Sequence, residues 1–275
     1  MSEPASASAA PANVVDFSHV TKRFGSLTVI RDVTFSVPDL PHKGEFIAIL
    51  GPSGCGKSTV LRLIAGLRPH HPPTEGTVLV GGKPVERPGS DRSMVFQDYT
   101  SFDNRTVEDN VAFGLECRGV AARERREHAR EWIGKVGLDV KRDATKYPSE
   151  LSGGMRQRVA IARTLILSPR IILMDEPFGA LDPTTRLHMQ ELLVKLWKEA
   201  EATVFFVTHS IEEAVYLGDR VYIFSSAPGT IIREMTIPAP TLPPKDMLRE
   251  RSFVERVSEI RDVMDGLASS TRAGD

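Results

Sequence analysis

The stretch Gly51-Pro52-Ser53-Gly54-Cys55-Gly56-Lys57-Ser58-Thr59 fits the pattern G-x-x-x-x-G-K-[ST] and lies between two apolar segments, residues 46–50 and 60–65. A short strand, a glycine-rich loop and a helix in this order predict a loop that binds phosphate. The glycines let backbone N–H groups point inward, and the start of the helix adds a positive charge of roughly half a unit. Lys57 supplies a full charge, and the Ser58 hydroxyl can ligate Mg²⁺. The alternative is a glycine-rich turn that only caps a helix, and the flanking pattern disfavours it.

Length and composition allow one large domain or two small ones with a sizeable core, because 41% of the 275 residues are hydrophobic. The net charge is −1, so no overall basic charge points to nucleic acid. Two cysteines, Cys55 and Cys117, are too few for a disulfide framework and favour a reduced, cytosolic protein. The N-terminus does not resemble a secretory signal, and the longest apolar region, residues 159–174, is interrupted by Arg163 and Arg170. We therefore expect any role at a membrane to come through a partner.

The hydrophobic pattern alternates between strands and helices, as in an α/β protein. Residues 1–13 predict a disordered tail, residues 21–25 a turn, and the proline-flanked pair His70-His71 a surface loop rather than a metal site. Residues 107–167 are helical in character, and the charge-dense segment 123–130 is typical of a solvated helix face. The predicted strands are residues 14–20, 28–37, 46–50, 76–80, 92–96, 171–174, 203–208 and 220–224, and the predicted helices are residues 60–65, 155–165, 187–196 and 211–217. Beyond residue 247 we expect an amphipathic helix that covers the core with Phe253, Val257, Ile260, Met264 and Leu267.

Three apolar strands end in residues that can bind or activate other groups: Gly51, the pair Asp175-Glu176, and His209. In parallel α/β sheets, ligands bind beyond the carboxyl ends of the strands. Because Asp175 and Glu176 are adjacent, one can reach a metal ion while the other faces an attacking water. Gln97 follows a further strand and could contact metal or water through its amide oxygen. Taken alone, Asp175-Glu176 would be interpreted as an ordinary acidic strand end and His209 as a core histidine. Beside the phosphate loop, a catalytic site is favoured.

Ser152-Gly153-Gly154 opens the predicted helix 155–165 and offers a second place where an anion can bind. It combines a hydroxyl, flexible backbone N–H groups and a helix N-terminus. A plain serine cap is the alternative. The first loop already binds one triphosphate, and a second anion-binding segment of the same chain is not required for that triphosphate. The pattern therefore suggests a nucleotide held between two subunits.

These motifs, in this order, make residues 14–232 resemble the ATP-binding subunit of an ABC transporter. Residues 51–59 match the family's Walker A motif, and residues 171–176 match Walker B. Residues 151–155 match the signature motif, although its commonest fifth residue, Gln, is replaced here by Met155. Residues 180–182 match the D-loop.

The resemblance implies a role for each matched residue. Glu176, His209 and Gln97 would be catalytic, and Ser58, Gln97 and Asp175 would ligate Mg²⁺. The residues expected to bind ATP are Phe24, which would stack on adenine, residues 51–59, Ser152, Gly153, Gly154 and Asp182. The implied fold is an α/β P-loop NTPase core, with a RecA-like mixed sheet, an antiparallel β subdomain and an inserted helical subdomain at about 98–168. Residues 233–275 would form a short C-terminal extension.

The resemblance also implies a mechanism and partners. Two copies would close head to tail around two ATP molecules and drive separate membrane permease subunits on the cytoplasmic face of the inner membrane, with residues 104–109 near the permease. The segment 225–231 and the short extension resemble importers for nitrate, sulfonate, taurine and related solutes, which work with an extracytoplasmic substrate-binding protein. Nucleic acid is not an expected partner.

Two alternatives to an importer subunit remain. A non-transport ABC ATPase is disfavoured, because the sequence lacks the long coiled coils of DNA-repair members and the tandem cassettes of translation-linked members. An interaction module that binds nucleotide without turnover is disfavoured by the presence of Glu176 and His209.

Overall fold

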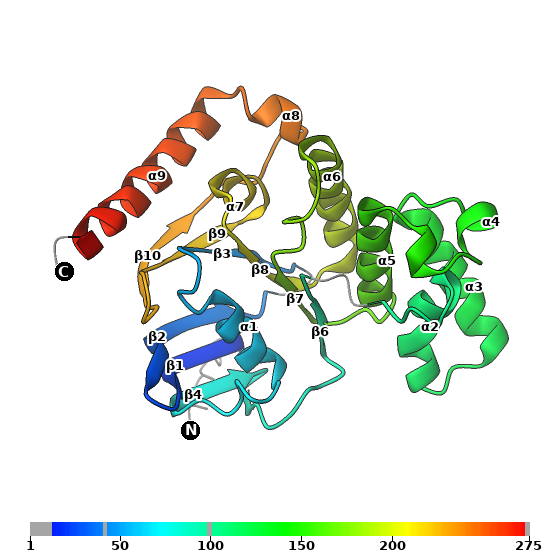
Figure 1. Ribbon diagram of the computed structural model, residues 1–275, viewed down its shortest axis with the longest axis horizontal. Coiled ribbons are helices and arrows are strands. Elements are labelled where there is room, and N and C mark those ends of the chain that lie inside the picture. The colour runs from blue at the N-terminus through cyan, green and yellow to red at the C-terminus, as the bar shows by residue number, and fades with distance from the viewer. Residues whose placement is uncertain (1–12, 41–42, 98–100, 273–275) are drawn as a thin grey trace, which may run out of the picture.

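The computed structural model describes residues 13–40, 43–97 and 101–272, with side chains described as far as residue 266. Two sheets form the centre of this described part (Figure 1). The larger sheet has six strands. Five neighbouring strands run parallel, and the edge strand β10 is antiparallel to β9. Its strand order is β10 (Ile231–Thr236), β9 (Arg220–Phe224), β3 (Phe46–Leu50), β8 (Thr203–Thr208), β7 (Ile171–Asp175) and β6 (Arg92–Val95).

The central strands β3, β8 and β7 are buried along their whole length, as expected for a parallel sheet covered on both faces. Alternate residues therefore enter two different cores. On one face, Ile49 and Phe205 pack with α1 (Lys57–Ala65) and the smaller sheet. On the other, Phe46 and Phe206 pack with residues of the helices α5 (Gly153–Leu165), α6 (Pro183–Ala200) and α7 (Ile211–Leu217).

The smaller sheet is antiparallel, with the order β2 (Leu27–Pro38), β1 (Asn13–Phe24), β4 (Glu75–Val80) and β5 (Lys83–Pro84) among the described residues. The predicted turn at residues 21–25 was wrong, because Thr21 to Phe24 continue β1 and the chain reverses only at Gly25 and Ser26. Irregularities in the β1–β2 register let the strand bend, so it stays paired up to Phe24 and Leu27. Asn13, expected in the tail, begins β1, and residues 1–12 of that prediction lie outside the described part.

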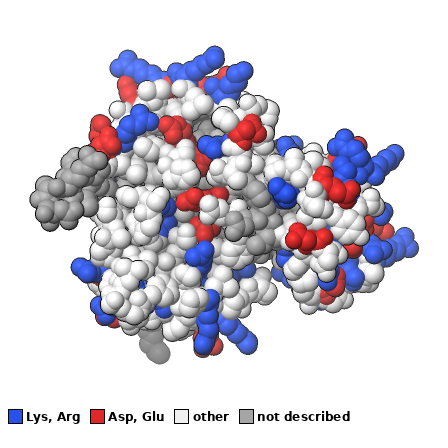
Figure 2. All heavy atoms as spheres, viewed as in Figure 1, with Lys and Arg blue, Asp and Glu red and all other residues white. Residues whose placement is uncertain are grey.

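A group of helices follows β6, on the right of Figure 1. It comprises α2 (Val107–Cys117), α3 (Ala122–Lys135), α4 (Val140–Asp143), the 3₁₀ turn η1 (Pro148–Glu150) and α5. The charge-dense segment lies on α3, where Ala129 is buried and Arg130 donates to Glu108 of α2 at 3.2 Å. Acidic and basic side chains are interspersed on the face shown in Figure 2, over these helices as elsewhere. The mixed signs agree with the solvated helix face predicted from the sequence.

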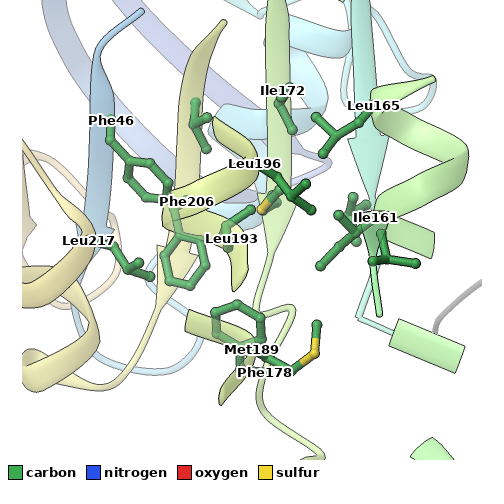
Figure 3. Packing of buried hydrophobic residues seen from close by; sticks show 14 of the residues in the cluster. Phe46, Ile161, Leu165, Ile172, Phe178, Met189, Leu193, Leu196, Phe206 and Leu217 are labelled. Atoms are coloured by element: carbon green, nitrogen blue, oxygen red, sulfur yellow. The ribbon is translucent and has the colours of Figure 1, made fainter. Parts of the chain in front are cut away.

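The C-terminal segment adds β10, α8 (Pro244–Met247) and α9 (Arg251–Arg272). Phe253, Val257 and Ile260 of α9 are buried in the core that α5, α6 and α7 also line, and Met264 packs against its edge. The side chain of Leu267 lies outside the described residues. Figure 3 shows this core where Phe46 and Phe206 meet Leu217, with residues of α5 entering from the other side. No helix in the described ranges is long and apolar enough to cross a membrane.

Candidate active site

The phosphate-binding loop connects β3 to α1 in a conformation that its glycines permit. Gly56 caps α1 with φ 97°, in the left-handed region. A Cβ atom at Gly56 would lie 2.4 Å from Ile30 Cγ2, so the loop packs too closely on β2 for a larger residue. Cys55, a residue of the loop itself, is buried, and burial raises the pKa of its thiol. This thiol is therefore a packing group rather than a reactive one.

A hollow of about 240 Å³ lies against this loop, and Glu176 and Val29 also line it. Lys57 is buried, and its Nζ donates to the carbonyls of Gly51 and Pro52 at 2.8 and 2.9 Å. The ammonium group is thus held within the curl of the loop. Backbone N–H groups at the helix start and this charge make the hollow suited to a phosphate chain.

Ser58 and Asp175 bring two oxygen atoms together beside the hollow. The Ser58 hydroxyl donates to Asp175 Oδ1 at 2.7 Å, across from α1 to the end of β7. Asp175 is buried, and burial raises its pKa, while the Ser58 hydrogen bond and the Arg62 charge oppose that rise. A hydroxyl and a carboxylate are hard oxygen ligands, so the pair fits a small divalent cation.

Glu176 and His209 face each other at the ends of the adjacent parallel strands β7 and β8. His209 Nδ1 lies 3.4 Å from Glu176 Oε2, and the His209 side chain is more than half exposed. Glu176 has φ 47°, so the chain changes direction directly after Asp175. Its N–H still donates to Val207 O at 3.0 Å. The turn buries Asp175 and aims Glu176 into the hollow, as the adjacent positions predicted.

The remaining predicted residues lie elsewhere in the single chain. Gln97 is exposed just after β6, and residues 98–100 are not described. Phe24 packs edge-on against His70, with ring centroids 5.2 Å apart, and Lys22 Nζ lies 5.1 Å from the Phe24 ring centroid. Neither Gln97 nor Phe24 is among the described residues that line the hollow.

Ser152 and Asp182 each cap a helix. Ser152 Oγ accepts from Met155 N at 3.3 Å, and Asp182 accepts from the N–H groups of the first turn of α6. The Thr185 side chain, together with these N–H groups, lowers the pKa of Asp182. A Cβ on Gly154 would lie 2.9 Å from Thr185 Cγ2, so the two helix starts lie side by side. Gly153, in contrast, has open space around its Cα. Within the described part of the chain, none of these residues lines the hollow of the phosphate loop.

Comparison with known proteins identifies the family. A model of the ABC transporter family matches residues 30–179. The chain belongs to the ABC transporter family. It is 45% identical to the nitrate import ATP-binding protein NrtD of a Synechocystis species, over 88% of this chain and 90% of that protein. It is 46% identical to the taurine import ATP-binding protein TauB of Rhizobium johnstonii, over 82% and 86%.

Solved structures agree with this assignment. An ABC cassette dimer bound to ADP and Pi in a post-hydrolysis state is 34% identical to this chain, with a TM-score of 0.70 over 82% of this chain and 100% of that one. The protein is therefore an ATP-binding ABC ATPase with the expected P-loop fold, in which a mixed sheet, an antiparallel sheet and helices are combined.

The structure of this ABC ATPase adds residues that the sequence did not single out. Arg62 Nη2 lies 3.5 Å from Asp175 Oδ2, and Val29 lines the hollow from β2. Arg62 follows Ser58 by four residues, and this spacing could have predicted that both lie on the same helix face. Nothing in the sequence indicated that Val29 lines the hollow. The surface-loop prediction for His70-His71 needs correction, because His71 is buried and His70 packs on Phe24. Among the described residues no cluster of three metal-ligating side chains occurs.

Proposed function

We propose that this ABC ATPase drives the import of a small solute, of the nitrate, sulfonate or taurine kind, through separate membrane permease subunits. Relatives at 45% and 46% identity are named for nitrate and taurine import, and they match most of the chain. The catalytic part of the proposal rests on one observation. The phosphate loop, Asp175, Glu176 and His209 lie together at one edge of the sheet. The subunit would then work at the cytoplasmic face of the inner membrane.

The residues of this site have distinct roles in ATP hydrolysis. Lys57 and the loop N–H groups hold the phosphates, and Phe24 stacks on adenine. Ser58 and Asp175, together with Gln97, would hold Mg²⁺, which would supply charge neutralisation for the phosphates. Glu176 accepts a hydrogen bond from the attacking water and orients it, and His209 contacts the terminal phosphate from the neighbouring strand.

The second anion-binding segment supports a head-to-tail dimer. Ser152, Gly153 and Gly154 sit at a helix start away from the hollow, together with Asp182. A second copy would bring this group against the phosphates held by Lys57. The solved cassette with which this chain shares a TM-score of 0.70 is described as dimeric.

A second hollow supports a site for the permease. It measures about 250 Å³ and is lined by residues of β6, α2 and α5, including Phe96, Phe113 and Arg163. The neighbouring segment 104–109 is fixed to it, because the Arg105 guanidinium lies 4.9 Å from the Phe113 ring centroid. An aromatic and cationic groove beside Gln97 can receive a short helix of a partner and relay its position to the active site.

One experiment tests both parts of the proposal. The tagged chain is recovered from membranes of its own organism, as wild type and as Glu176→Gln, and the ATPase rate of each complex is measured. We expect both to carry an integral membrane protein and the variant to hydrolyse ATP roughly 10²–10⁴-fold more slowly, because it loses the base that orients water. Recovery without any integral membrane protein would contradict transport. An unchanged rate in the variant would contradict the role of Glu176.

A further inference from the structure

The turn that carries His209 is fixed by a buried carboxylate, Glu213, on α7. Thr208 Oγ1 donates to Glu213 Oε2 at 2.6 Å, and the backbone N–H of Ser210 donates to Thr208 Oγ1 at 3.0 Å. Ser210 Oγ in turn accepts from the Glu213 N–H at 3.2 Å. The residues on both sides of His209 are therefore tied to the same acidic residue.

The same carboxylate also contacts α6, the helix that Asp182 caps. Gln190 Nε2 donates to Glu213 Oε1 at 3.4 Å, and Arg186 Nε lies 3.7 Å from that oxygen. Arg186 Nη2 donates to the carbonyl of Leu181 at 3.0 Å. Glu213 thus connects the turn of His209, through Arg186, to the segment 180–182.

Burial makes this arrangement costly to alter. The Glu213 side chain is only 7% exposed, and burial raises its pKa, while Thr208, Arg186 and Gln190 favour the charged form. A buried carboxylate is stable only when its oxygens are satisfied, so a shift of either loop would leave it short of partners. Among the described residues the buried Arg186 Nε has no hydrogen-bond partner, so its interaction with Glu213 is the charge contact at 3.7 Å. A shift of the His209 turn or of the segment 180–182 would therefore disturb the contacts of Glu213.

We propose that Glu213 is a positioning residue for ATP hydrolysis, which holds His209 3.4 Å from Glu176 and links that contact to the segment 180–182. The inference rests on the proposed role of His209 in turnover. Glu213 is buried on α7 and contacts Thr208 and Ser210 on either side of His209, so it acts through His209 and not on the nucleotide. Its loss should slow turnover while leaving ATP binding to one chain largely intact.

The test is a double-mutant cycle on the full chain, with steady-state ATPase rates and ATP affinities for Glu213→Ala, His209→Ala and the double variant. We expect Glu213→Ala to lower kcat by about 10–100-fold, because misplacing a reacting group by about 1 Å costs that order of rate, and to change KM by less than about 3-fold. In the His209→Ala background the same change should cost less than about 2-fold, because coupled residues are not additive. Glu213→Gln, which keeps an acceptor for Thr208 but loses the charge that faces Arg186, should retain more of the rate than Glu213→Ala.

Two further variants keep the test decisive. Thr208→Val removes the hydroxyl without opening a cavity and should reproduce the Glu213→Ala loss if that variant folds poorly. Glu212→Gln removes the neighbouring charge, which pairs with Arg261 at 3.2 Å, but keeps an acceptor for the Ser210 hydroxyl, so the rate should be unchanged. Equal losses from Glu213→Ala with and without His209, or a weakened ATP affinity that accounts for the whole loss, would overturn the inference. Full activity of His209→Ala would instead overturn the proposed role of His209, and the inference with it.

Discussion

Glu176 illustrates how a single backbone torsion arranges this site. Its φ of 47° is unusual for a residue with a side chain, and glycine would adopt it more easily. Glycine, however, has no carboxylate to place beside His209. The surrounding sheet enforces the torsion, since the Glu176 N–H is still bonded to Val207 O of β8. Strain at this residue is therefore the means by which two consecutive acidic residues face different surroundings, one buried with Ser58 and one in the hollow.

Phe24 carries a prediction at the same scale. Phe24→Ala should weaken ATP binding about tenfold, because stacking on a base contributes about 1–3 kcal/mol. Phe24→Tyr keeps the ring face and should bind ATP within about 2-fold of wild type. Calorimetric titration with ATP in the Glu176→Gln background measures affinity without turnover. Equal affinities of the alanine and parent proteins would show that adenine does not stack on this ring.

Among the elements, α9 offers a test of how firmly the C-terminal segment is packed. Ile260 is fully buried against the core, whereas Val254 on the same helix is 52% exposed. Ile260→Ala should lower the free energy of unfolding by about 2–5 kcal/mol, through lost burial and a residual cavity. Val254→Ala, the matched control, should change it by less than about 0.5 kcal/mol. Urea denaturation of the nucleotide-free protein measures both, and equal midpoints would mean that α9 is not docked in solution.

Some of these elements were predictable from the sequence for a clear physical reason. The strands β3, β7 and β8 are continuous apolar runs because both of their faces are covered, and α7 has the predicted limits of residues 211–217. The end of β1 was missed because Lys22 and Arg23 look like turn residues, although pairing with β2 continues past them. The strand β10 was also missed, since four of its six residues are exposed and it is held by one neighbour, β9. Motif residues were found by type and spacing, whereas Glu213 carries no motif signal, and its role depends on contacts between α6 and α7.

At the scale of the whole molecule, we propose that the single chain holds two incomplete anion-binding surfaces. Lys57 and Ser58 stand at the hollow, while Gly153 and Asp182 stand at helix starts outside it. A symmetric head-to-tail pair would complete both surfaces at once, giving two equivalent sites. Glu213 would then connect, within each chain, the residues of its own site to a segment that borders the other site. Closure of one site would therefore affect the conformation of the second.

Mixing two inactive variants tests whether the sites are completed between chains. Lys57→Ala removes the charge at the phosphate loop, and Gly153→Asp places a carboxylate in open space at the second surface, where the added Cβ meets nothing within 4 Å. Each variant alone should be inactive, yet a mixed dimer holds one site with both surfaces intact. A mixture of equal parts should recover up to about a quarter of the wild-type ATPase rate, the value for independent sites, since half of randomly paired dimers are mixed and each has one complete site of two. Circular dichroism of each variant controls for folding. A folded Gly153→Asp variant that is fully active alone would mean that each chain builds its site without the second surface.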